Sequence, residues 1–326
     1  MRLRRTSLLI ALGAALACAA PAGAAAGGLR FAGAWGSHGV AEGQFLLPDG
    51  IAVDSGGNVW VADRNRNRIE RFTSAGRFRP FPAFRSRHRS AAPGRLNLPY
   101  DVAVDRAGRI YVADTHNDRI QEFSRKGRLI RRWGSHGTAA GQFDQPRAVA
   151  LDPFGNVWVA DHENKRVQKF TAGGRFLGRF GAHAGDGTAG SGEGEFNSPR
   201  GLSSDAQGDI YVADDANNRI VKLGNDGGFL MQWGRRGAGD GELKLPYSTA
   251  VDAAGNVWVT DTNNNRLQEF TADGTFVARF GANGGDTTPG AGPGEFDHPY
   301  DLAFDRAGNL YVTDEGNQRV EKFATR

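Results

Sequence analysis

The chain has 326 residues, of which 39% are hydrophobic and 23% charged, and its formal net charge is +4. A chain of this length can bury a sizeable core, and its single cysteine excludes an intrachain disulfide framework. A charge so close to neutral argues against nonspecific nucleic-acid binding, which needs a strongly basic face.

Residues 1–26 have the pattern of an export signal. Arg2, Arg4 and Arg5 form a basic start, Ser7–Ala17 is an apolar run too short to span a bilayer, and Pro21–Ala26 offers small residues for cleavage. Removing this segment with its three arginines lowers the formal charge from +4 to +1. We therefore expect a secreted or extracytoplasmic protein without a transmembrane segment.

An alternative interpretation makes Cys18 the acylated first residue of a lipoprotein. Ala15–Ala17 matches poorly the Leu-small-small sequence that precedes such a cysteine, whereas the cleavage zone downstream of Cys18 is good. We favour cleavage after the cysteine, which would leave none in the mature chain.

One pattern occurs six times: a glycine, an apolar run that ends in aspartate, a polar turn, an arginine and a second apolar run. Its spacing of roughly 50 residues indicates a solenoid or a propeller. The copies are Gly57–Phe72, Gly108–Phe123, Gly155–Phe170, Gly208–Leu223, Gly255–Phe270 and Gly308–Phe323.

Each repeat predicts four short strands, which we call a to d in chain order. In the second repeat they are Pro99–Asp105, the run around Tyr111, Arg119–Phe123 and Arg128–Trp133. β-branched and aromatic runs lie between glycine-rich turns without helical spacing, and Asp-x-x-Gly is typical of the short turn between strands a and b. Four antiparallel strands per repeat make one propeller blade, so the fold class is all-β.

The last repeat lacks its own strand d. The strand d aromatic follows the aspartate of strand b by 19 residues, as Trp133 follows Asp114, and the same offset from Asp314 runs beyond the C-terminus. Leu29–Trp35 resembles Leu129–Trp133. We predict that this N-terminal strand completes the last blade, which closes residues 27–326 into one six-bladed β-propeller domain of four-stranded antiparallel blades.

The proline before strand a, the Asp-x-x-Gly turn and the Val-Ala-Asp-x-x-Asn-x-Arg-Ile-x-x-Phe pattern resemble the NHL-repeat family of β-propellers. The resemblance covers nearly all of the chain after about residue 29 and implies a six-bladed propeller. NHL-like propellers include the lyase that completes peptide amidation, whose zinc is held in the central cavity by histidines from different blades.

The seven histidines do not repeat that arrangement. His38, His136 and His183 each follow the strand d aromatic by three residues, which places them at the rim, and no histidine follows the proline of strand a. We therefore predict no metal site and no cofactor, because a zinc site needs three converging ligands. A Ser-His-Asp triad remains open, since triads are geometric, but no nucleophile elbow is present.

An aspartate and an arginine five residues apart end strand b and begin strand c in every blade. We predict that they hold the hairpin by a charge-assisted hydrogen bond, rather than forming a functional ring of charge. The asparagine three residues after that aspartate is expected at positive φ. The pairs are Asp63/Arg68, Asp114/Arg119, Asp161/Arg166, Asp214/Arg219, Asp261/Arg266 and Asp314/Arg319, and the asparagines are Asn117, Asn164, Asn217, Asn264 and Asn317.

The two residues after the proline of strand a differ from blade to blade. Because strand a should line the channel, these side chains should ring its mouth, where they either bind a ligand or merely solvate the entrance. Arg147 and Arg200 come from neighbouring blades and could grip one anionic group together. The candidate ligand-binding residues are Tyr100, Asp101, Arg147, Arg200, Tyr247, Tyr300 and Asp301.

The sequence thus predicts a monomeric binding module without catalytic residues, whose partner is a protein, a peptide or a small anionic ligand. The alternative is an enzyme with its site in the channel, either an amidating-type lyase or a lactonase-like hydrolase. The fold does not decide between them, because propellers host both binding and catalysis.

Overall fold

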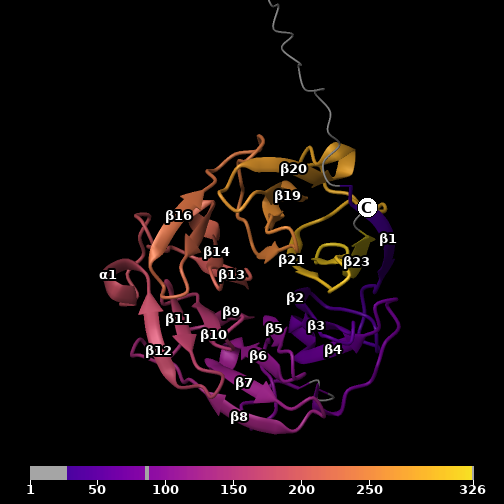
Figure 1. The fold of residues 1–326 in the computed structure, drawn as a ribbon. Coiled ribbons are helices and arrows are strands. Elements are labelled where there is room, and N and C mark those ends of the chain that lie inside the picture. Colours follow the sequence, from indigo (N-terminus) through magenta and orange to yellow (C-terminus); the bar gives the residue numbers. More distant parts are fainter. Residues whose placement is uncertain (1–27, 85–87, 325–326) are drawn as a thin grey trace, which may run out of the picture.

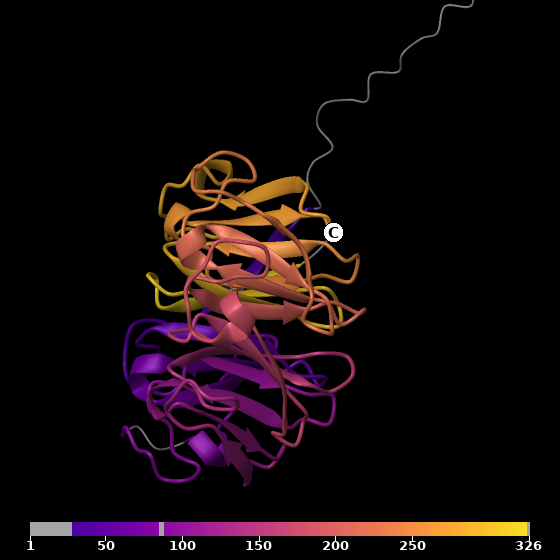
Figure 2. The same cartoon turned by 90° about the vertical axis from the view of Figure 1, so that its left-hand side faces the viewer.

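A computed structural model describes residues 28–84 and 88–324 as a ring of six sheets around a central axis (Figure 1). Turned on its side, the ring is a disc (Figure 2). The predicted signal at residues 1–26, with Cys18, lies outside the described residues. Within the described part of the chain, no helix has the length and apolar character needed to cross a membrane.

The sheets follow one another along the chain, and each contributes its strand a to the centre. Their strands are β2 (Pro48–Val53), β3 (Val59–Asp63) and β4 (Arg68–Phe72) in blade 1; β5 (Asp101–Val104), β6 (Ile110–Asp114), β7 (Arg119–Phe123) and β8 (Leu129–Trp133) in blade 2; β9 (Pro146–Leu151), β10 (Val157–Asp161), β11 (Arg166–Phe170) and β12 (Phe176–Phe180) in blade 3; β13 (Pro199–Ser204), β14 (Ile210–Asp214), β15 (Arg219–Leu223) and β16 (Phe229–Trp233) in blade 4; β17 (Thr249–Val251), β18 (Val257–Asp261), β19 (Arg266–Phe270) and β20 (Phe276–Gly281) in blade 5; and β21 (Pro299–Phe304), β22 (Leu310–Asp314), β23 (Arg319–Ala324) and β1 (Arg30–Trp35) in blade 6.

The helices among residues 28–84 and 88–324 are all short, of three or four residues. Four of them, η1, η3, η4 and η5, lie between strands b and c, and the others lie in loops. Their bounds are η1 Arg64–Arg66, η2 Pro82–Phe84, η3 Thr115–Asn117, α1 Ala182–Gly185, η4 Asp215–Asn217, η5 Thr262–Asn264 and η6 Ala282–Gly284.

The turns between strands a and b form as predicted. In blade 1 the Asp54 carboxylate accepts the backbone N–H of Asn58 at 2.9 Å, and the N–H of Gly57 bonds to the Asp54 carbonyl at 2.9 Å. Gly57 has φ +76°, a conformation that glycine adopts without a steric penalty. The Asp-x-x-Gly pattern therefore sets the hairpin geometry.

The core is divided among the gaps between neighbouring blades. Six apolar clusters of buried residues occupy these gaps; for example, Trp158 and Phe196 belong to the cluster of blades 3 and 4. Each blade is thus stabilised by two neighbours, as a propeller requires. The cluster between blades 6 and 1, which includes Tyr311 and Phe72, makes the ring continuous.

The N-terminal strand closes the ring. β1 pairs with β23 in an antiparallel register that sets Phe31 opposite Phe323 and Trp35 opposite Val320. The two ends of the described chain therefore share one sheet, which confirms the predicted closure.

Blade 1 departs from four regular strands. Its sheet has three, and the place of strand d is taken by an isolated bridge between Phe72 and Phe78, with the N–H of Arg79 bonded to the Arg71 carbonyl at 2.7 Å. The chain then continues into η2, whose Phe84 is buried in the core between blades 1 and 2.

The repeated Asp–Arg pairs hold the hairpins as predicted, with Nε to Oδ2 distances from 2.6 to 3.1 Å. In blade 5, Arg266 also donates to the carbonyls of Gly239 and Glu242 in the preceding loop at 2.8 and 3.0 Å. The prediction for the asparagines was wrong: Asn264 donates to Asp261 at 2.9 Å, and the positive φ of 52° belongs to Asn265.

Candidate functional site

The residues that follow the strand a prolines lie together at one end of the channel. Pro48, Pro199 and Pro299 pair with the aspartates that end strand b, so the turns between strands b and c lie at the same end. We call this end the mouth and define it by Asp49, Tyr100, Arg147, Arg200, Tyr247 and Tyr300. That these residues bind a ligand stays a prediction.

Tyr100 is the centre of one half of the mouth. The guanidinium carbons of Arg64 and Arg147 lie 4.7 and 4.8 Å from the centroid of its ring, within range of cation–π attraction. Arg64 also donates to the Tyr100 hydroxyl at 2.7 Å. The buried tyrosine therefore holds two cations over the channel.

Acidic groups offset the charge of Arg64. Its Nε lies 2.8 Å from Oδ2 of Asp49, and its Nη2 lies 3.1 Å from Oε1 of Glu315. Asp49 is fully buried, and burial raises the pKa of its carboxyl well above the ordinary value, although Arg64 acts to lower it.

The opposite half of the mouth is built on two tyrosines. The rings of Tyr247 and Tyr300 lie 4.1 Å apart between centroids, and the guanidinium carbon of Arg200 lies 4.9 Å from the Tyr247 centroid. Arg200 also forms an ion pair with Asp215. Burial raises the pKa of both tyrosines, so their hydroxyls remain protonated hydrogen-bond donors at neutral pH.

Arg147 is the exception among the three arginines. No carboxylate among the described residues lies within ion-pair distance of its guanidinium, whereas Arg64 and Arg200 each form an ion pair. Arg64 contacts two carboxylates and Arg200 contacts one, so acids and arginines are equal in number here, but the Arg147 guanidinium itself has no ion-pair partner among the described residues and lies next to tyrosine rings.

His162 lies at the same end but does not titrate in the physiological range. Burial, with the nearby charges of Arg147 and Arg200, lowers the pKa of its imidazole to about 2. Its Nδ1 lies 3.3 Å from both the Pro199 carbonyl and the Ser198 hydroxyl. His162 is therefore a neutral hydrogen-bonding group.

Asp101 and Asp301 differ from the expectation that they face the entrance. Asp101 accepts the N–H groups of Val102 and Val149 at 2.7 and 2.8 Å, and Asp301 accepts those of Leu302 and Ile51 at 2.8 and 2.7 Å. Each carboxylate thus links its own strand a to that of the next blade. Burial raises the pKa of Asp101, and it raises the pKa of Asp301 to about 6.

These two carboxylates belong to a solid layer beneath the mouth, which we call the floor. A Cβ on Gly50 would lie 2.6 Å from Cα of Asp101, and one on Gly201 would lie 2.4 Å from Cα of Ser248. Only about 10 Å³ of space remains between the floor and the mouth residues. A ligand at this end must therefore lie on the outer surface of the mouth.

Sequence reasoning missed Arg64, Glu315 and Asp215. Each begins a turn between strands b and c, and this position also differs from blade to blade: Arg64, Thr115, His162, Asp215, Thr262 and Glu315. The variability that identified the residues after the prolines would have identified this second ring.

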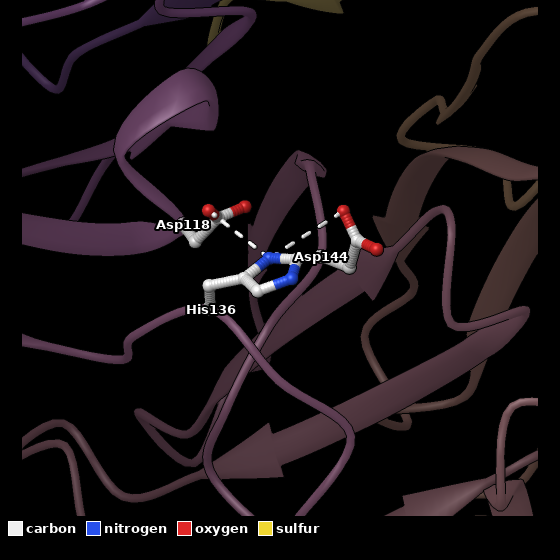
Figure 3. A group of neighbouring side chains, drawn as sticks. All are labelled: Asp118, His136 and Asp144. Carbon is white, nitrogen blue, oxygen red and sulfur yellow. Dashed lines mark ion pairs between the residues drawn. The ribbon is translucent and has the colours of Figure 1, made fainter.

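The histidines predicted to lie at the rim do not converge. His136 instead meets two aspartates, with its Nδ1 3.4 Å from Asp118 and 3.9 Å from Asp144 (Figure 3). One nitrogen and two carboxylate oxygens within 4.8 Å of one another are donors that a divalent metal ion accepts. However, the His136 side chain is 71% exposed, and Asp118 already binds the Gln145 N–H at 2.8 Å, so the contacts are those of an ordinary loop between blades.

A model of the NHL repeat matches the chain at residues 45–72, 96–123, 143–170, 196–223, 243–270 and 296–323. These matches fall on strands a to c of the six blades. Together they cover more than half of the chain.

Two curated relatives match shorter segments. Protein brain tumor of Drosophila melanogaster is 36% identical over 105 residues, which are 31% of this chain and 10% of that protein. Peptidyl-alpha-hydroxyglycine alpha-amidating lyase 1 of the same species is 33% identical over 94 residues, 28% of this chain and 17% of the lyase. The match thus spans a small part of each relative.

Among solved structures, a gluconolactonase, XC5397 from Xanthomonas campestris, superposes with a TM-score of 0.61 at 15% identity over 87% of each chain. At this identity the likeness concerns the fold.

Proposed function

The chain belongs to the NHL-repeat family, and from that premise we propose that it is a binding module that recognises an anionic group at the mouth of its propeller. The group is a carboxylate or phosphate, carried by a small molecule or by an acidic peptide. The signal pattern at residues 1–26 further supports work outside the cytoplasm.

The absence of an ion-pair partner for Arg147 among the described residues supports this proposal. Arg147 is partly buried, and a partly buried guanidinium without a carboxylate partner is costly unless an acceptor approaches its terminal N–H groups from outside. Its stacking on Tyr100 fixes the fork of its remaining N–H groups, which suits two-point contact with a carboxylate or phosphate.

The neighbours of Arg147 favour recognition. Tyr247 and Tyr300 offer flat, protonated and amphipathic surfaces, and Arg200 supplies a second cation beside them. The mouth is preorganised, because its side chains hold one another by stacking and hydrogen bonds. A ligand would therefore lose little affinity to ordering of the site.

The proposal is tested with Arg147→Ala. Inorganic phosphate, citrate and a panel of acidic peptides are titrated calorimetrically into the wild-type chain, the variant and a control that carries Arg128→Ala with Arg175→Ala. The control arginines are exposed and lie in turns between strands c and d. Loss of one charge-assisted contact weakens binding of the tightest probe by roughly 10- to 100-fold at unchanged melting temperature.

Equal affinity in the wild type and Arg147→Ala would refute the proposed role of the mouth. Binding by the control variant should match the wild type. Adding Arg200→Ala should weaken binding further only if both arginines contact one anion, which is the arrangement that the sequence predicted.

A channel enzyme is the second candidate, because one relative is named as an amidating lyase. Assay of the mature protein with peptidyl-hydroxyglycine and lactone substrates, alongside elemental analysis, separates the two functions. Turnover that falls with Arg147→Ala would favour the enzyme over a pure binding module.

A further inference from the structure

The end of the channel opposite the mouth is open and apolar. Beyond the floor, a hollow of about 240 Å³ is lined by strand a of all six blades. At equivalent positions the six strands present five alanines and a serine: Ala52, Ala103, Ala150, Ser203, Ala250 and Ala303. These small side chains line the hollow together with the apolar residues before them.

The next position on each strand makes the opening of this hollow apolar. It holds three valines, a leucine, a serine and a phenylalanine: Val53, Val104, Leu151, Ser204, Val251 and Phe304. These residues are only partly buried, so the channel wall exposes apolar surface. Apolar surface in a concave site favours ligands that can cover it.

Two further hollows adjoin the channel at Val104. One of about 520 Å³ lies over the turns between strands a and b of blades 2, 3 and 4, and another of about 180 Å³ lies towards blades 1 and 6. Phe154 stands between Pro153 and Gly155 of the larger hollow and is 67% exposed. The three adjoining hollows together are large enough to hold a small organic molecule.

Two arginines mark the smaller hollow. Arg106 and Arg306 both line it, both are exposed, and neither forms an ion pair with any described residue. They belong to blades 2 and 6, on either side of blade 1. Arg109, by contrast, is paired with Asp105 and Glu122.

We infer that this end of the channel binds a small amphipathic molecule, with its apolar body in the alanine-lined channel and its anionic group at Arg106 and Arg306. The floor makes the channel a dead end, so the apolar body enters first and the charged group stays at the rim. This site is separate from the mouth and does not rest on the function proposed above.

The test uses 1-anilinonaphthalene-8-sulfonate, which is apolar and carries one anionic group, with decanoate as a competitor. The wild-type chain should bind the dye saturably at one site and release it to decanoate. Arg106→Ala with Arg306→Ala should weaken dye binding by roughly 3- to 10-fold, because two exposed charges each contribute modestly.

A second variant fills the channel. Ala103→Leu with Ala303→Leu places two larger side chains opposite the partly exposed apolar wall and should weaken binding at least roughly tenfold. The control is again Arg128→Ala with Arg175→Ala, which removes two exposed arginines from the same face but from the turns between strands c and d.

Circular dichroism and thermal melting confirm that each variant is folded before titration. If the leucine variant does not fold, the arginine pair alone decides, because both arginines are exposed. Unchanged dye affinity in a folded arginine variant, or nonsaturable dye binding by the wild type, overturns the inference. Weakening in the control equal to that in the arginine variant does so as well.

Discussion

The third residue of strand c is a buried polar residue in five of the six blades, but it is an amide in one region of the ring and an acid in another. In blades 2, 3 and 5 its third residue is a glutamine; Gln268, for example, donates to Asp261 at 3.0 Å and to the Glu242 carbonyl at 2.6 Å, and accepts the Gly241 N–H at 3.0 Å. In blades 1 and 6, which meet at the closure, the equivalent residues are Glu70 and Glu321.

The glutamates make fewer of these contacts. Each binds the arginine two residues before it, at 3.2 Å for Glu70 and 3.1 Å for Glu321, but Oε2 of each is buried without a hydrogen-bond partner among the described residues. An ionised carboxylate cannot donate as an amide does. Burial accordingly raises the pKa of Glu70 to about 7 and that of Glu321 to about 8.

The comparison teaches that the third position of strand c is least well satisfied in the two blades that meet at the closure. At this position blades 2, 3 and 5 use neutral, hydrogen-bonded amides and blade 4 has Val221, whereas blades 1 and 6 have two buried acids. Blade 1 also lacks a regular outer strand, and blade 6 takes its outer strand from the N-terminus. Stability should therefore be most sensitive at this seam.

The largest expected effect comes from removing the closing strand. A chain that starts at residue 36 should be less stable than one that starts at residue 28 by about 5 kcal/mol or more, because it loses the buried contacts of Phe31 and Trp35. These residues pack on Phe323 and on Phe72 and Tyr311, respectively. Denaturant unfolding of the two chains measures the difference.

The matched control is Trp133→Ala, which removes the equivalent aromatic from an interior blade. We expect the control to remain folded and to lose about 3–5 kcal/mol. If the shortened chain melted within a degree or two of the longer one, the closing strand would not hold the ring.

A smaller loss of stability should follow when the buried glutamine of an interior blade is replaced by the glutamate found in blades 1 and 6. Gln268→Glu would place a carboxylate beside Asp261 Oδ2 and remove two donated hydrogen bonds, so we expect about 2–4 kcal/mol less stability at pH 8. The loss should shrink at pH 5, where the new acid can be protonated. A variant as stable as the wild type at pH 8 would show that the amide contacts carry little weight.

The reverse change should stabilise the seam. Glu70→Gln with Glu321→Gln supplies the missing donors, and we expect a gain of roughly 1–3 kcal/mol at pH 8. In the wild type these raised pKa values mean that the folded chain keeps protons that the unfolded chain has released. Stability from these groups is therefore present near pH 4.5 and is lost as the pH rises towards 7 and 8.

Urea unfolding at pH 5 and pH 8 measures both effects. The gain of the double variant should be larger at pH 8 than at pH 5. An equal gain at the two values would mean that the glutamates do not hold protons in the folded chain.

Much of the fold could be predicted, because its determinants are local and repeated. The Asp-x-x-Gly turn, the Asp–Arg pair and the fixed offset to strand d recur in register, so blade number and closure follow from counting. The irregular edge of blade 1 was not predicted, since its sequence from Arg77 to Phe84 departs from the repeat. The positive φ was misplaced by one residue because Asn264 is needed as a donor to Asp261.

The candidate site was only half predictable. The position of Tyr100 and Arg147 at the mouth follows from their place after the strand a proline. That Asp101 turns inward depends on the space left by Gly50 in the neighbouring strand, which is a tertiary contact. The open apolar end was not predicted. Alanine and valine form no recognisable functional motif in the sequence, and only the fold brings these residues of six strands together around one hollow.

The floor, which contains Asp101, Asp301, Gly50 and Gly201, lies between the two ends of the channel. At this layer neighbouring a strands approach too closely for a Cβ on Gly50 or Gly201, and the space narrows from about 240 Å³ at the open end to about 10 Å³ beside the mouth, so a ligand at one end does not touch a ligand at the other. We therefore expect a ligand bound at one end to leave the affinity of the other end unchanged, so that the two sites bind without cooperativity. A measured coupling between them would point to the groups that bond neighbouring a strands at this layer: the Asp101 and Asp301 carboxylates, and the Gly50 and Gly201 N–H groups, which donate to the Tyr100 and Tyr247 carbonyls.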